Sequence, residues 1–149
     1  MKDHRVASLV AAALGLAVAA PFMAAEDEQG FVRIKPDEIV YEKRETGPDI
    51  AVIAGDPTKE GFYIVRARFA PGVMSQPHYH PNDRHVTVIS GTWYTGTGTK
   101  FDRDATVPLQ AGSYMLHPAG AVHYDGAKDQ EVIVEIKGMG PAPTVPANQ

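Results

Sequence analysis

The stretch GVMSQPHYHPNDRHVTVISG, residues 72–91, decides the fold. It holds three of the six histidines, and two of them, His78 and His80, are separated by one residue. On an extended strand, side chains two residues apart point to the same face. The ProAsnAsp run at 81–83 is typical of a tight turn, and 85–90 has the composition of a following strand. The pattern predicts two imidazoles at one strand end, an arrangement that suits a divalent metal.

A second stretch, GSYMLHPAGAVHYDGA at residues 112–127, has a similar plan. The segment 113–117 is typical of a strand, and the turn residues ProAlaGly at 118–120 end it. His123 follows three residues after this turn. The stretch therefore supplies a third candidate imidazole beside a strand end.

The two stretches together resemble the paired motifs of the cupin superfamily. The first motif has a glycine, an HxH pair, a glutamate and a closing glycine, and the second has a glycine, PxG, a histidine and an asparagine. The chain matches the spacing at every glycine, proline and histidine, namely Gly72, His78, His80, Gly91, Gly112, Pro118, Gly120 and His123. The wider sequence is similar to small exported single-domain bacterial cupins.

The resemblance implies an all-β fold, the cupin-type double-stranded β-helix or jelly-roll barrel, with a metal at its mouth. It also implies that His78, His80 and His123 are ligands of Fe, Mn, Zn, Ni or Cu. Three neutral imidazoles leave coordination positions for water or a substrate, as a catalytic metal site requires.

The chain departs from these motifs at two positions. Arg84 replaces the motif glutamate and Ala127 replaces the asparagine. An arginine cannot ligate a metal and always carries a positive charge. A cation beside a divalent metal is costly unless an anion lies between them. Arg84 therefore predicts a nearby carboxylate, either from a substrate or from the protein.

Three interpretations of the missing ligand stay open. In the first, His85 takes the place of the glutamate, although strand alternation turns it away from Arg84 unless a bulge rotates it. In the second, the three histidines hold the metal alone, as in thiol dioxygenase-like cupins, and Arg84 binds the carboxylate of an anionic substrate. In the third, there is no metal, and Arg84 forms a structural ion pair inside the pocket.

Glu135 is a candidate partner because it lies within the apolar run 132–136. A carboxylate buried in such a strand needs a partner. It could pair with Arg84, Arg66 or Arg68, supply an oxygen to the metal, or face solvent by strand alternation.

Two more polar residues flank the second motif. His117 is either a group that supports the metal site or a structural histidine with satisfied hydrogen bonds. Asp125 either orients His123 or forms an Asp-Gly turn with Gly126.

The beginning of the chain has the plan of a secretory signal peptide over residues 1–25. Basic residues precede the apolar run 6–20, and acidic residues follow at 26–28. Cleavage after Ala25 or after Ala19 fits, so the site is uncertain. We expect a periplasmic or secreted protein. The run is too short for a comfortable membrane span of about 20 residues, and an uncleaved anchor is the alternative.

The remaining sequence predicts strands, since it has no sustained helical period and turn residues recur about every 8–12 residues. The expected strands are 50–54, 62–69, 85–90, 92–95, 113–117 and 131–137. We expect N-terminal strands within 26–61 to pack on a barrel at 62–138, followed by a proline-rich tail at 139–149.

Composition excludes several classes of function. The absence of cysteine excludes disulfides, thiolate catalysis and cysteine-based zinc sites. The net charge of −4, without a basic patch, makes nucleic acid an unexpected partner.

These observations favour a metal-dependent enzyme that acts on a small molecule as an oxygenase, isomerase or lyase, with Arg84 as a catalytic residue that steers an anionic substrate. The fold cannot choose among these reactions. The alternatives are a non-catalytic module that binds a metal or small ligand, and a barrel that serves only as a scaffold or homodimer. A roomy cavity beside the metal favours the enzyme, whereas a pocket plugged by Arg84 favours the others.

Overall fold

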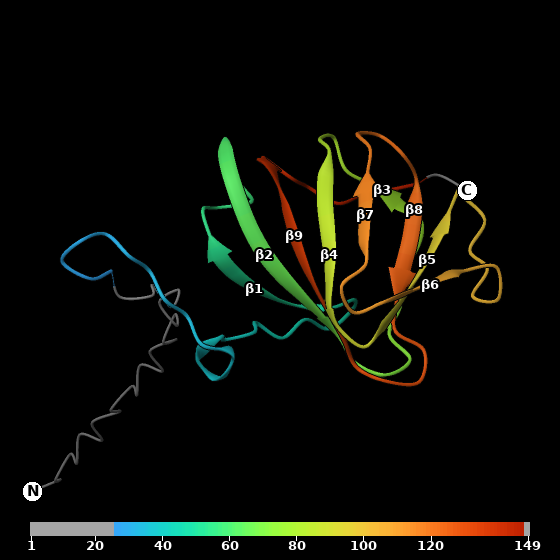
Figure 1. Ribbon diagram of the computed structural model, residues 1–149. Helices are drawn as coiled ribbons and strands as arrows, with labels where there is room; N and C mark the ends of the chain where they lie inside the picture. The colour runs from blue at the N-terminus through green and yellow to red at the C-terminus, as the bar shows by residue number, and fades with distance from the viewer. Residues whose placement is uncertain (1–25, 148–149) are drawn as a thin grey trace, which may run out of the picture. The chain divides into compact units, whose positions relative to one another are not determined.

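The computed structural model describes residues 26–147 (Figure 1), so the predicted signal peptide and the last two residues lie outside the described part of the chain. Residues 26–33 belong to a separate unit from residues 34–147. In the first unit, the Asp27 carboxylate accepts hydrogen bonds from the backbone of Gln29 and Phe31 and pairs with Arg33.

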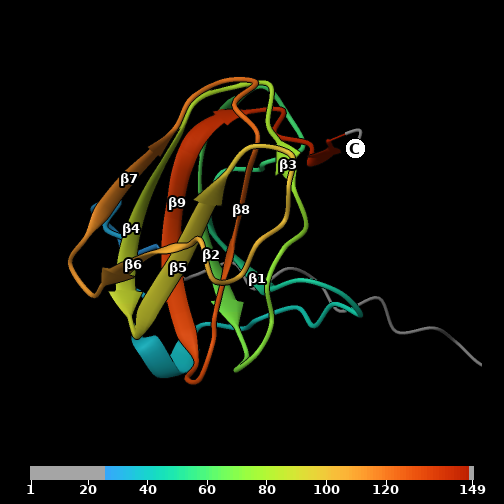
Figure 2. The ribbon, with the colours of Figure 1, turned by 90° about the vertical axis from the view of Figure 1, so that its right-hand side faces the viewer.

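The second unit consists of two antiparallel sheets of five strands each. One sheet has the order β1 (Asp49–Ala54), β2 (Gly61–Phe69), β9 (Val132–Gly140), β4 (Arg84–Ser90) and β7 (Tyr114–His117). The other has the order β10 (Val145–Pro146), β3 (His78–Tyr79), β8 (His123–Gly126), β5 (Thr92–Thr97) and β6 (Val107–Gln110). The two sheets face each other (Figures 1 and 2). The only helix among residues 26–147 is the single 3₁₀ turn η1 (Pro36–Glu38), so the all-β prediction is confirmed.

Alternating side chains build the core between the sheets. In β2, the four residues from Tyr63 to Phe69 that occupy odd positions are buried, and the residues between them are more exposed. β9 follows the same rule. The buried cluster consists of Tyr63, Val65, Ala67, Phe69, Val86, Val88, Trp93, Ala127, Val132, Val134 and Ile136. This period of two is what an apolar core between two sheets selects.

The outer face of the first sheet carries ion pairs. Glu135 lies opposite Arg66 in the register between β9 and β2, and Glu135 Oε2 is 3.0 Å from Arg66 Nη2. Glu135 Oε1 is 3.0 Å from Lys137 Nζ. Of the partners considered for Glu135, the structure therefore selects Arg66, on the face of the sheet opposite to the core.

The second sheet contains the largest departure from the predicted elements. Asp125 and Gly126 belong to strand β8, so of the two alternatives for Asp125 the Asp-Gly turn is wrong. The reason for the glycine is space, because a Cβ atom at Gly126 would lie 2.3 Å from the carbonyl oxygen of Val73. Strand β8 thereby turns Asp125 toward the inside of the barrel with His123, two residues earlier.

The tail follows β9 along the end of the barrel. Val145 pairs with Tyr79 of β3, and the backbone nitrogen of Ala147 donates to the carbonyl oxygen of Pro77 at 3.0 Å. β9 itself runs two residues past 138, the predicted end of the barrel. Within residues 26–147, no helix has the length and apolar character that a membrane crossing needs.

Core burial predicts the cost of truncating β9. Val134 is 0 % exposed, so replacing it with alanine leaves a cavity and should lower the free energy of unfolding by roughly 2 kcal/mol. Val107→Ala is the matched control, because Val107 is 59 % exposed and should change stability by less than about 0.5 kcal/mol. Urea denaturation of both variants measures the difference. Equal losses would contradict the assigned core.

Candidate metal centre

Three histidines converge at one end of the second sheet. His78 of β3 lies directly opposite His123 of β8 in the strand register, and His80 follows one residue after β3. Their ring centroids are 5.0 Å apart for His78 and His80, 4.5 Å for His78 and His123, and 5.5 Å for His80 and His123. Each ring contributes a nitrogen to a group whose members all lie within 4.8 Å of one another. We call His78, His80 and His123 the outer trio.

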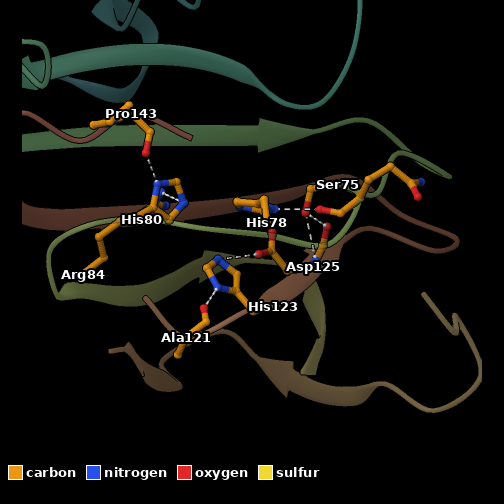
Figure 3. Close-up of polar contacts among 9 residues, drawn as sticks. Ser75, His78, His80, Arg84, Ala121, His123, Asp125 and Pro143 are labelled. Atoms are coloured by element: carbon orange, nitrogen blue, oxygen red, sulfur yellow. Dashed lines mark hydrogen bonds and ion pairs between the residues drawn. The ribbon is translucent and has the colours of Figure 1, made fainter. Parts of the chain in front are cut away.

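Backbone carbonyls orient every ring of the outer trio (Figure 3). His78 Nδ1 lies 2.7 Å from the oxygen of Gln76, His80 Nδ1 lies 2.9 Å from that of Pro143, and His123 Nδ1 lies 2.9 Å from that of Ala121. A carbonyl only accepts, so each Nδ1 carries the proton and each Nε2 keeps a lone pair. Such an outer hydrogen bond on the far ring nitrogen is the usual support of a metal-ligating histidine.

The surroundings favour neutral imidazoles. His80 and His123 are buried, whereas His78 is partly exposed at the rim. Burial, reinforced by Arg84, lowers the pKa of His80 to about 3. Burial also lowers the pKa of His123, against the opposing effect of Asp125. Neutral imidazole is the form that binds a metal, so the buried histidine cluster can hold an ion near neutral pH.

Arg84, on strand β4 of the first sheet, also reaches the site. Its Nη1 donates a hydrogen bond to His80 Nε2, the lone pair that a metal would use. Its Nε is closed to solvent and has no hydrogen-bond partner. Within residues 26–147, Arg84 forms no ion pair with any carboxylate. Burial lowers the pKa of Arg84, while Tyr63 and Asp125 act in the opposite direction.

His85 lies outside this group. It is exposed, and its Nδ1 shares a hydrogen bond of 2.8 Å with the hydroxyl of Tyr114 on β7. Strand alternation on β4 is the cause, since Arg84 and Val86 face inward and His85 faces outward. The structure therefore brings Arg84 to the three histidines of the outer trio and keeps His85 apart from them. The interpretation in which His85 takes the glutamate's place has no geometric support.

Two polar residues that the sequence analysis left with structural alternatives also face the site. His117, at the end of β7, has its ring centroid 3.7 Å from that of His123. Asp125 Oδ2 lies 3.8 Å from His123 Nε2. His117, His123 and Asp125 form a second group whose candidate ligand atoms lie within 4.8 Å of one another. The sequence signal was the His-x-Asp spacing on β8, which repeats the spacing of His78 and His80.

Two surface depressions are lined by residues outside this cluster. One of about 530 Å³ is lined by Phe62, Asn82, Asp83, His85, Ala119, Gly138 and Met139. Another of about 320 Å³ lies over β5 and β6 and includes Tyr114 of β7. At the histidine cluster itself, Arg84 is hydrogen-bonded to His80.

Comparison with known proteins agrees with the two-sheet fold. Residues 57–145 match the family described as Cupin. The chain belongs to the cupin family. Its fold is the one that its motifs implied.

Curated plant proteins are among the relatives of this cupin. Germin-like protein 2-1 of Oryza sativa subsp. japonica is 28 % identical over 109 residues, which are 69 % of this chain and 50 % of that protein. Germin-like protein subfamily 2 member 4 of Arabidopsis thaliana is 32 % identical over 93 residues, 59 % of this chain and 42 % of that protein. The cupin thus spans about half of these relatives' length or less.

Solved structures share the fold at low identity. A polyketide cyclase from Streptomyces resistomycificus superposes with a TM-score of 0.66 at 17 % identity, covering 80 % of this chain and 87 % of that chain. A protein with a double-stranded β-helix domain from Klebsiella pneumoniae gives a TM-score of 0.60 at 23 % identity, covering 78 % and 97 %. These likenesses concern the fold alone.

The lowered histidine pKa values predict acid instability of the metal-free protein. Burial lowers the pKa of His80 to about 3 and that of His117 to about 2, against about 6.5 in the unfolded chain. The unfolded state therefore binds more protons below pH 6.5, and stability falls as the pH decreases. At pH 5, each histidine should lower the free energy of unfolding by about 2 kcal/mol relative to pH 7 and above.

Urea denaturation of chelator-treated protein at pH 7.5 and pH 5 measures this loss. His117→Leu removes one titrating ring and should lose about 2 kcal/mol less between the two pH values. His85→Leu, on the outer face, is the matched control and should keep the full loss. A pH-independent stability in the unmodified protein would show that the buried rings are not neutral in the folded state.

Proposed function

We propose that this cupin binds a divalent transition metal on the outer trio and uses it on a small anionic molecule that engages Arg84. The observation that carries the proposal is the set of three carbonyls that hold the Nδ1 protons of His78, His80 and His123 outward. Three inward Nε2 lone pairs fit Fe, Mn, Zn, Ni or Cu. When bound, such a metal supplies Lewis-acid polarisation of a ligand oxygen or a site for dioxygen.

Arg84 is the residue of the site that would bind an anion. Its charge is largely buried, its Nε has no partner, and no carboxylate of residues 26–147 pairs with it. A guanidinium binds a carboxylate through two parallel hydrogen bonds, which is stronger than its single bond to His80. An anionic ligand would therefore draw Arg84 away from His80 and release the His80 lone pair for the metal. Arg84 then serves to bind and orient the anion.

The site is compatible with more than one class of reaction. An oxygenase, an isomerase and a lyase all fit a histidine-bound metal beside an anion site, and the activities named for the structural neighbours differ. The contact between Arg84 and His80 also favours a second candidate, a non-catalytic cupin that binds a metal or small ligand, because it occupies the His80 lone pair. In either case we propose an exported protein, on the strength of the predicted signal peptide at 1–25.

Metal analysis of the purified protein tests the centre. The unmodified protein, stripped with chelator and reloaded with Co²⁺ or Mn²⁺, should retain one ion per chain. His123→Ala should retain none, since it removes a buried ligand, and His85→Ala should retain the full amount because that ring lies on the outer face. Plasma mass spectrometry measures the content. Absence of metal from the unmodified protein would contradict the proposal.

The anion is tested in the same samples. Acetate added to the Co²⁺-loaded protein should change the visible absorption spectrum as Arg84 leaves His80. Arg84→Gln should abolish the acetate response while keeping the metal, and Arg103→Gln, a surface arginine, should leave the response unchanged. A response that persists in Arg84→Gln would show that the anion binds elsewhere.

A further inference from the structure

We propose that the barrel contains a second position for the metal, formed by His117, His123 and Asp125, which the ion occupies while Arg84 is bonded to His80. We call this group the inner seat. It rests on the proposed function only in taking the ligand to be the same divalent metal. His123 belongs to both groups, and its Nδ1 is bonded to the oxygen of Ala121, so only its Nε2 is left to bind. The outer trio and the inner seat are therefore alternatives for one ion.

The inner seat takes its residues from one strand of each sheet. His117 ends β7, and β8 carries His123 and Asp125 on one face. The exposed fractions of His117, His123 and Asp125 are 2 %, 3 % and 6 %. The ring of Trp93 lies 5.6 Å from that of His117 and closes one side. The group is therefore held by regular strands in a dry environment.

The polar atoms of the inner seat lack partners. Both ring nitrogens of His117, and Nε2 of His123, are closed to solvent without a hydrogen bond. The Asp125 carboxylate has only the 3.8 Å approach to His123 Nε2, which is too long for a hydrogen bond. Buried imidazoles and a buried carboxylate are costly when they are left unpaired. A cation bound among them would satisfy all three side chains at once.

Electrostatics separates the two positions. The outer trio contains no carboxylate, and the Arg84 guanidinium already holds the His80 lone pair. The inner seat contains the carboxylate of Asp125 and leaves that contact undisturbed. A divalent ion gains from an anionic ligand, and Arg84 occupies a ligand atom of the outer trio only, so the ion favours the inner seat. Asp125 thus supplies, from β8, the carboxylate that position 84 of β4 lacks.

Co²⁺ titration of the full, metal-free chain without added carboxylate tests the inner seat. Trp93 is the only tryptophan, so quenching of its fluorescence by Co²⁺ reports on an ion beside His117. We expect Asp125→Asn and His117→Leu to weaken Co²⁺ binding at least about tenfold and to lose the quenching. His78→Ala should change the affinity less than about threefold. Asp129→Asn and His85→Gln, both exposed, are the matched controls and should match the unmodified protein.

Thermal unfolding supplies a readout that a structural role of Asp125 would not give. Metal-free Asp125→Asn should melt at or above the temperature of the unmodified protein, because the substitution removes a buried charge whose carboxylate makes no hydrogen bond. Only its Co²⁺-induced rise in melting temperature should be reduced. A metal-free Asp125→Asn protein that is clearly less stable would point to a structural carboxylate and overturn the inner seat.

The failure of this inference differs from that of the proposed function. Normal binding and quenching in Asp125→Asn and His117→Leu, with binding lost in His78→Ala, would overturn the inner seat and leave the outer trio as the centre. No Co²⁺ binding by the unmodified protein would overturn both.

Discussion

The hydrogen bond from Arg84 to His80 is the interaction on which the chemistry of this barrel depends. It joins a buried cation to one of the lone pairs that a metal would use. In the family motif that this chain resembles, the same position holds a glutamate, an anion that would ligate the metal directly. The replacement inverts the charge at the site, so metal binding requires either an anion from outside or a carboxylate elsewhere in the chain.

The strand register brings Arg84 close to the residues of the inner seat. Arg84 of β4 lies directly opposite His117 of β7, so neighbouring strands carry the cation and the inner histidine. On β8, His123 and Asp125 share the inward face, and the close approach of Val73 that requires Gly126 helps to set this strand. His123 thus belongs to both the outer trio and the inner seat. One ion and one arginine can then occupy two complementary arrangements.

Much of this could be predicted from the sequence. The period of two in residues 62–69 and the recurring turn residues lead to the all-β fold, because strand alternation is a local property. The convergence of His78, His80 and His123 is implied by the resemblance to the cupin motifs. The inward position of Asp125 could not be predicted with the same security. Asp-Gly is also a turn signal, and the contact that keeps Gly126 in a strand comes from residues 73 and 74, far away in sequence. The bond between Arg84 and His80 likewise depends on side-chain geometry that no spacing encodes.

The ligands of the bound metal test the account most directly. X-ray absorption of the Co²⁺-loaded protein, without added anion, should show two imidazoles and one carboxylate around the ion, as the inner seat provides. Arg84→Gln frees His80, and its spectrum should shift to three imidazoles without the carboxylate. Three imidazoles in both proteins would contradict the account, since the metal would then ignore Arg84.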